Sequence, residues 1–369
     1  MVDLYQLAVA RIKGLGNRAV QTIISNLDSP KALFELGEKD LRFILGTKEQ
    51  AIQDILSKSM FDKCEKELEF MQKYNINSYF YTDEGYPNRL KQINDKPICL
   101  FVQGDVNFEY TRMAAVVGSR KYSDYGKDVT EQVVEQLHKL GVYVVSGLAY
   151  GIDSIAHTYS LNKSLPTIAV MATGLDTIYP REHKELAERI LQSQGCAIVT
   201  EYFTGTSPLR FNFPARNRII AGLVDVVIVV EASKTGGALL TAKLANDYNR
   251  EVIAVPGRID DKNSEGCNFL INSNRAHIMS NLSVIGNVMA WNEHNTTPSL
   301  FKETKEDRGI NLRGLEKKIY YTLKDKGEMD IDTLLITLGV PFNDLSSSLL
   351  NMELCDLVLA KPGRVYKVI

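Results

Sequence analysis

Two stretches decide the fold: residues 113–120 read MAAVVGSR, and residues 142–153 read VYVVSGLAYGID. Each is a short apolar run that ends in glycine and polar residues. Continuous apolar runs are typical of strands that are covered on both faces, as in parallel sheets. Between the two stretches, residues 127–139 have the spacing of an amphipathic helix. The alternation therefore predicts a β–α–β unit.

The same alternation continues to about residue 283. Further strands are predicted at 167–171, 197–200, 226–231 and 252–255, and further helices at 183–194 and 239–249. We therefore expect residues 111–283 to form an α/β domain with a doubly wound, mostly parallel, Rossmann-like sheet. Such sheets bind ligands beyond the carboxyl ends of their strands. The residues that follow each predicted strand are thus the first candidates for a binding site.

Three segments flank this domain. Residues 1–110 have helical apolar spacing and a Gly14-Leu15-Gly16 turn, and they predict a SAM-like or helix-hairpin-helix-like domain with a lead-in strand at 98–103. Residues 284–312 are polar and predict a linker. Residues 313–369 predict three helices and a terminal hairpin, as in a winged helix. Acidic and basic residues balance in this last domain, so a protein contact is at least as compatible with it as docking on duplex DNA.

Composition excludes several classes of protein. The chain has 43 Lys and Arg against 45 Asp and Glu, a net charge of −2, so an anion site must be a local patch. The five cysteines are scattered and form no C-x-x-C, so we expect no disulfide framework, no metal site and a reducing cytoplasm. No apolar run is long enough to span a bilayer, and the start has no signal-peptide pattern.

The candidate site residues follow the predicted strands. Gly118, Ser119 and Arg120 come after the first strand, where a hydroxyl and a guanidinium suit a phosphate or a carboxylate. The dinucleotide pattern G-x-G-x-x-G is absent, so no cofactor is expected. Gly147 and Gly151 follow the second strand and allow a close backbone approach, whereas Asp153 is as compatible with capping the next helix as with a binding role.

The densest segment is 207–220, SPLRFNFPARNRII, in which arginines alternate with aromatic residues and no carboxylate occurs. Guanidinium groups suit a phosphate backbone, and flat rings suit unstacked bases, so the pattern favours single-stranded nucleic acid. The alternative is that some arginines pair with acids elsewhere in the fold. The candidates here are Arg210, Phe211, Phe213, Arg216, Asn217 and Arg218. Gly236 and Gly237 add a glycine turn before a helix, which is a common anion site.

Seven motifs resemble the DNA-processing protein A family (DprA, also called Smf) in order and spacing. They are GSR, SGLAYGID, TGLDTIYP, FPARNRIIAGL, TGGALLTA, VPG and EGCNFLI, all within residues 118–271. The resemblance implies a cytoplasmic bacterial protein that binds single-stranded DNA without sequence specificity and protects it. It also implies a homodimer through the Rossmann-like domain that loads the RecA recombinase during natural transformation, and no enzymatic activity.

Transferred by motif, the resemblance places Arg120, Arg181 and Arg210 in the DNA pocket. Arg181 and Arg210 stand where the family often has lysine, so the charge is retained. Three places depart from the family pattern: Tyr150 stands where lysine is common, Phe203 where proline is common, and Arg275-Ala276 where Gly-Ala is expected.

A second family with this kind of sheet is the alternative. The lysine-decarboxylase-like phosphoribohydrolases, which cleave nucleoside monophosphates, carry PGGxGTxxE with a glutamate in the catalytic apparatus. The matching residues 234–241 read KTGGALLT and contain neither the Pro-Gly-Gly nor the glutamate. The sequence therefore favours a binding protein over a hydrolase.

Overall fold

The computed structural model describes residues 2–110, 112–291, 314–354, 357–361 and 364–368. It divides into two compact units, Met1–Asn295 and Thr296–Ile369. Most of the predicted linker, 292–312, lies outside the described residues. Its first part does not: helix α14 (Ser283–Met289) occupies most of 284–291, with Ile285 and Trp291 buried against the sheet. Burial of these apolar residues explains why this part of the polar segment is helical.

Within the described residues, nine strands form one sheet in the order β1-β2-β6-β5-β4-β3-β7-β8-β9. Pairing is parallel from β6 to β9 and antiparallel at the β1–β2–β6 edge. The prediction of a mostly parallel sheet is confirmed. The strands are β1 (Asn77–Phe80), β2 (Cys99–Gly104), β3 (Met113–Val117), β4 (Tyr143–Ser146), β5 (Thr167–Val170), β6 (Ala197–Thr200), β7 (Val226–Val229), β8 (Glu251–Ala254) and β9 (His277–Ile278).

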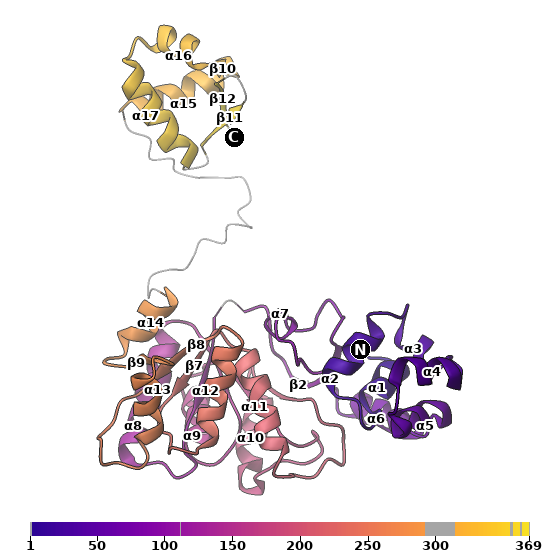
Figure 1. The fold of residues 1–369 in the computed structure, drawn as a ribbon. Helices are drawn as coiled ribbons and strands as arrows, with labels where there is room; N and C mark the ends of the chain where they lie inside the picture. Colours follow the sequence, from indigo (N-terminus) through magenta and orange to yellow (C-terminus); the bar gives the residue numbers. More distant parts are fainter. Residues whose placement is uncertain (1, 111, 292–313, 355–356, 362–363, 369) are drawn as a thin grey trace. The chain divides into compact units, whose positions relative to one another are not determined.

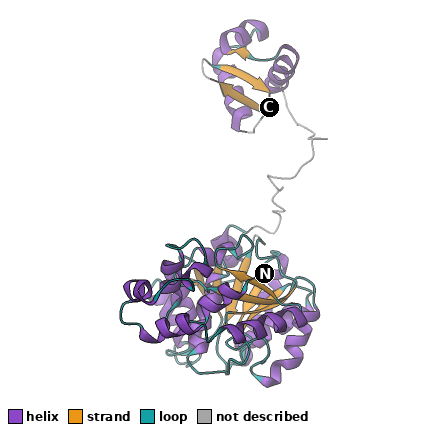
Figure 2. Cartoon of the chain, turned by 90° about the vertical axis from the view of Figure 1, so that its right-hand side faces the viewer, coloured by secondary structure: helices purple, strands orange, loops and turns teal. Residues whose placement is uncertain are grey.

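Helices cover both faces of this sheet (Figures 1 and 2). Alternate side chains of β3 point to opposite faces, so that Val117 lies in one core and Val116 in the other. The Val116 face is covered by α8 (Asp124–Lys139), α9 (Ile152–Asn162), α10 (Lys184–Gln192) and α14. The Val117 face is covered by α7 (Asn88–Lys91), α11 (Asn212–Gly222), α12 (Gly237–Asp247) and α13 (Glu265–Asn272). A short 3-10 turn, η1 (Arg181–His183), precedes α10.

The N-terminal helices pack on the β1–β2 edge of the same sheet. They are α1 (Leu4–Ala10), α2 (Asn17–Ile24), α3 (Pro30–Leu33), α4 (Glu38–Leu45), α5 (Glu49–Ser57) and α6 (Phe61–Lys73). Strand β2 is apolar on both sides: Phe101 packs on these helices, and Val102 packs in the sheet core. The helices and the sheet therefore share one compact unit. The predicted domain boundary at residue 110 comes after β2, the edge strand that already belongs to the sheet, and not directly after α6.

The described residues of the second unit form three helices and a three-stranded antiparallel sheet. Its elements are α15 (Gly314–Lys326), β10 (Met329–Asp330), α16 (Ile331–Leu338), α17 (Phe342–Leu354), β11 (Val358–Lys361) and β12 (Val365–Val368), with the strand order β10-β12-β11. The predicted Pro362-Gly363 turn lies outside the described residues. Ile319, Leu334, Leu349 and Val358 form the core of this unit. Its identification as a winged helix stays a prediction.

No helix among the described residues combines the length and the apolar character that crossing a membrane requires.

Candidate functional site

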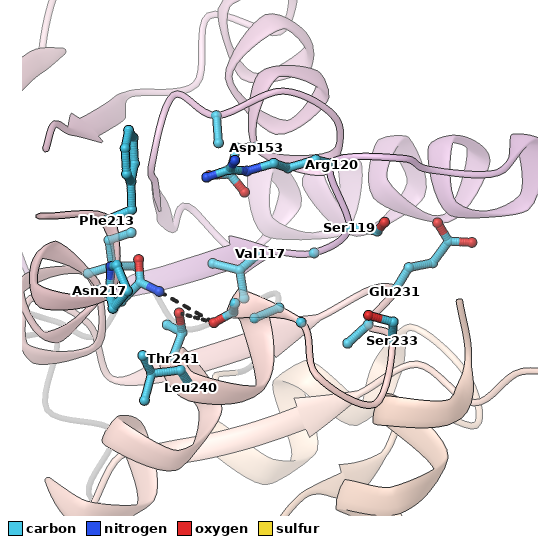
Figure 3. A pocket seen from close by; sticks show the side chains of 18 of the residues that line it. Val117, Ser119, Arg120, Asp153, Phe213, Asn217, Glu231, Ser233, Leu240 and Thr241 are labelled. Carbon is cyan, nitrogen blue, oxygen red and sulfur yellow. Dashed lines mark hydrogen bonds between the residues drawn. The ribbon is translucent and has the colours of Figure 1, made fainter. Parts of the chain in front are cut away.

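The strand order creates a crevice beside β3. From β3 the chain continues to β4, β5 and β6 on one side, and then crosses to β7, β8 and β9 on the other. At such a switch point the loops after the two central strands diverge, and the space between them is the usual ligand site. A cleft of about 1010 Å³ lies here, lined by the loops after β3 and β7 and by the first turns of α11 and α12 (Figure 3).

Two glycines lock the loops of the cleft together. Gly151 has φ of +83°, and a Cβ there would lie 2.2 Å from the carbonyl oxygen of Ser119. The next amide, of Ile152, donates to that same oxygen at 3.2 Å. At Gly147 a Cβ would lie 2.6 Å from the Arg216 guanidinium. Both glycines therefore act by close packing, which holds the Ser119-Arg120 loop at the cleft.

A cation and two aromatic rings meet at one wall of the cleft. The guanidinium carbon of Arg120 lies 5.4 Å from the ring centre of Phe213, within the range of a cation–π contact. The ring centre of Tyr179 also lies 5.4 Å from that of Phe213. Residues from the segments after β3 and β5 and from α11 thus combine into one surface of flat rings and positive charge.

Three cations line the cleft. They are Arg120, Lys121 and Arg210, and none of the three forms an ion pair within the described parts of the chain. Opposite them, α12 begins at Gly237 after Gly236, and no side chain caps this helix end. The Asn217 amide and the Thr241 hydroxyl donate to the Gly237 carbonyl, at 3.3 and 3.4 Å (Figure 3). The Leu239 amide donates to the Gly236 carbonyl at 3.1 Å, whereas the Gly237 and Ala238 amides have no acceptor among the described residues. Open amides at a helix N-terminus favour an anion.

The floor of the cleft holds a buried arginine. Arg216 is 4% exposed, and its Nη1 donates to the carbonyl oxygens of Gly147, at 2.6 Å, and Val170. Burial lowers the pKa of Arg216 to about 10, against the attraction of Asp153, which acts to raise it. Burial has the opposite effect on the acid and raises the pKa of Asp153. The Asp153 carboxylate accepts a hydrogen bond from the Gly147 amide at 3.0 Å. Arg216 therefore supplies positive potential to the cleft, and its hydrogen bonds hold the backbone at Gly147 and Val170 in place.

The predicted residues divide into three groups. Those that line the cleft are Gly118, Ser119, Arg120, Arg210, Phe213, Arg216, Asn217, Gly236 and Gly237. Gly147 lines a small cavity beside it, and Gly151 supports the loop from behind. Phe213, Asn217 and Ile220 share a cleft-facing side of α11 because an α-helix repeats every 3.6 residues.

Besides Gly147 and Gly151, three predicted residues do not line the cleft. Arg218 is turned away on α11 and pairs with Glu201, which is the alternative that the sequence left open for these arginines. Phe211 is 68% exposed, and Arg181 is also exposed. Sequence reasoning missed Lys121, Tyr179, Ser233 and Asn263 as lining residues. Lys121 and Tyr179 could have been found, because Lys121 directly follows the GSR motif and Tyr179 belongs to the TGLDTIYP motif.

The two carboxylates that line the cleft already accept hydrogen bonds from other groups of the protein. Asp153 and Glu231 line the cleft, and both are buried. Glu231 accepts from the amide and the hydroxyl of Ser123 at the start of α8. Residues 234–241 contribute backbone and no carboxylate. Among the described residues, no cluster of His, Cys, Asp and Glu could hold a metal ion.

Comparison with known proteins points to one family. Residues 77–290 match the model of the family described as DNA recombination-mediator protein A, and the match begins at the first residue of β1. Protein Smf of Escherichia coli strain K12 is 36% identical over 285 residues, which are 76% of this chain and 74% of that protein.

Two solved structures are similar. DNA processing protein A from Streptococcus pneumoniae has a TM-score of 0.64 at 34% identity, and the match covers 78% of this chain and 98% of that one. DNA processing protein A from Helicobacter pylori, described for its single-stranded DNA binding mode, has a TM-score of 0.53 at 29% identity and covers 59% of this chain and 96% of that one. The family match spans more than half of the chain and the whole of the switch-point cleft, and the chain belongs to the DNA recombination-mediator protein A family, the family of the DprA and Smf proteins.

Proposed function

We propose that this chain binds single-stranded DNA in the switch-point cleft and takes part in DNA processing during natural transformation. One observation carries the proposal: Arg120 and Arg210, which form no ion pair with any described residue, line the same cleft as the ring of Phe213. A single strand offers charged phosphates and exposed base faces, and this surface supplies a partner for each. The Helicobacter pylori relative, which is described as binding single-stranded DNA, supports the choice of ligand.

Binding is expected to be independent of sequence. Cations and helix amides contact phosphates, which are alike in every nucleotide, and aromatic rings stack on any base. Reading base edges requires side chains held in a fixed hydrogen-bonding geometry, such as an Asn or Gln that both donates to and accepts from adenine. The amide of Asn217, which could do so, is directed to the Gly237 carbonyl.

The cellular role follows the family resemblance. The chain is proposed to protect the strand and to load RecA recombinase onto it in the cytoplasm, as a homodimer through the Rossmann-like domain and without an enzymatic step. Two joined clefts would raise the effective concentration of the second site along one strand. The nucleotide hydrolase alternative has no observation in its favour, since the cleft carboxylates are bound to backbone and hydroxyl groups.

The test is a titration of the full chain with a fluorescent oligothymidylate and with a duplex of the same length, each at two salt concentrations. The single strand should bind more tightly, and its affinity should fall with salt because phosphate contacts release counterions. Equal affinities with no salt response would reject the proposal. Release of free base from nucleoside monophosphates would instead support the hydrolase.

A further inference from the structure

The loop between β6 and α11 carries Arg210 to the cleft, and a buried carboxylate from the N-terminal helices holds this loop. Glu67 lies on α6 and is 3% exposed. Its carboxylate accepts two hydrogen bonds from Thr204: from the amide, 3.1 Å from each oxygen, and from the hydroxyl at 2.7 Å. The two residues are 137 positions apart in the chain, so this is a tertiary contact between the helices and the cleft loop.

The same carboxylate holds a second group from the helices. Arg11 donates from Nη2 to Glu67 at 2.9 Å, and its guanidinium carbon lies 3.9 Å from the ring centre of Phe203. The Phe203 ring packs on Phe101 of β2, with ring centres 5.2 Å apart. Residues 203 and 204 are therefore clamped by the N-terminal helices and by the edge strand.

The other side of the turn is held by the loop after β5 and by a hydrogen bond within the turn itself. The amide of Gly205 donates to the Asp176 carboxylate at 2.9 Å, and the Thr206 hydroxyl donates to the Phe203 carbonyl at 2.6 Å. The chain then reaches Pro208 and Arg210, both of which line the cleft. The side chain of Arg210 has no ion pair among the described residues, so its place depends on where the backbone leaves the clamp.

From these contacts we infer that Glu67 is a positioning residue for the cleft, acting through Thr204 on Arg210. The inference rests on the proposed function and adds a role for the N-terminal helices in it. Glu67 lies outside the set of lining residues and cannot contact the strand itself. Its effect on binding must therefore pass through the loop, and it should vanish when Arg210 is already shortened.

The test is a double-mutant cycle in the full chain, read as affinity for oligothymidylate. Glu67→Gln keeps the shape of the side chain and removes the charge, and we expect about fivefold weaker binding. Arg210→Ala should weaken binding about tenfold. The double variant should bind like Arg210→Ala, within about twofold, because coupled residues are not additive. Glu69→Gln is the matched control: it is exposed on the same helix and should bind like the parent.

Each other outcome has a distinct meaning. Wild-type affinity of Glu67→Gln, or losses that multiply in the double variant, would overturn the inference and leave the proposed function intact. Wild-type affinity of Arg210→Ala would overturn the proposed cleft and this inference with it. Should Glu67→Gln not fold, as judged by its thermal transition, Thr204→Val takes its place in the cycle with the same criteria, since it removes only the hydroxyl donor of the tie.

Discussion

The guanidinium of Arg120 lies over the ring of Phe213, with its carbon 5.4 Å from the ring centre. Arg120 follows β3, whereas Phe213 lies in the first turn of α11, which leads into β7. Since β3 and β7 are the two strands at the switch point, this contact closes one wall of the cleft across it. Several consequences can be measured.

Charge reversal in the cleft should abolish most binding. Because the net charge is −2, no general positive field compensates for a lost local cation. Arg120→Glu or Arg210→Glu should weaken single-strand affinity at least about 100-fold, or roughly 2.7 kcal/mol. The control is Lys139→Glu, an exposed change at the far end of α8. Reversed variants that fold and titrate like the parent would show that the strand binds elsewhere.

A methyl group at Gly147 should destabilise the fold. It would lie 2.6 Å from Arg216 Nη2 and 2.7 Å from Asp153 Oδ2, and neither buried partner can withdraw without losing its hydrogen bond. We expect Gly147→Ala to reduce the free energy of unfolding by about 2–3 kcal/mol. Gly237→Ala, where a Cβ meets no atom within 4 Å, should be nearly neutral. Similar urea midpoints for the two variants would contradict the packing argument.

Acid should destabilise the protein through His157. Its side chain is fully buried and its Nδ1 lies 2.7 Å from Thr167 Oγ1. The Thr167 hydroxyl donates its only proton to the Val144 carbonyl, so its oxygen accepts a hydrogen bond from His157. The neutral imidazole therefore carries its proton on Nδ1. Burial, with His183 and Arg216 nearby, lowers the pKa of His157 from 6.5 to about 3.

The folded chain therefore binds fewer protons than the unfolded chain between pH 3 and pH 6.5. The contribution of His157 to the free energy of unfolding is complete above pH 6.5 and is lost as the pH falls. At pH 4.5 the loss is about 2–3 kcal/mol. Urea unfolding at pH 7.5 and pH 4.5 measures it. His157→Asn should be less stable at pH 7.5 but should lose less stability between the two pH values. An equally steep loss in that variant would assign the acid sensitivity to other groups.

Tyr150 offers a gain-of-affinity test. Its hydroxyl donates to Glu182 at 2.6 Å, and this hydrogen bond raises the pKa of Tyr150, so the side chain is neutral at pH 7. It borders the small cavity beside the cleft together with Arg120. Tyr150→Lys adds a cation there and should steepen the slope of log affinity against log salt by about 0.7. Tyr74→Lys, exposed on the N-terminal helical segment, should leave the slope unchanged.

Self-association can be measured directly. The proposed homodimer should sediment at twice the chain mass at micromolar concentration, since paired clefts bind one strand with the advantage of a high effective concentration. A monomer across that concentration range would remove the dimer from the proposed function. Single-strand binding by one cleft would be unaffected.

The sequence by itself determined the parallel core. Apolar runs such as 113–117 and 226–231 can be buried only when both faces of the sheet are covered, so their alternation with amphipathic helices specifies the layers without knowledge of contacts. It also placed Arg120, Phe213 and the Gly236-Gly237 turn, because the carboxyl ends of parallel strands share one edge. Strands β1 and β9 were not found, since β1 begins with the polar residues Asn77 and Ser78 and has no continuous apolar run, and β9 has only two residues.

Tertiary structure decided which side chains of a cationic segment are free. Arg210, Arg216 and Arg218 look alike in the sequence. In the structure Arg210 lines the cleft without an ion pair among the described residues, Arg216 is buried under the cleft, and Arg218 pairs with Glu201. The rotation of α11 and the position of Glu201 at the end of β6 separate them. The clamp of Glu67 on Thr204 was likewise invisible, because a hydrogen bond across 137 positions follows from packing and leaves no local pattern.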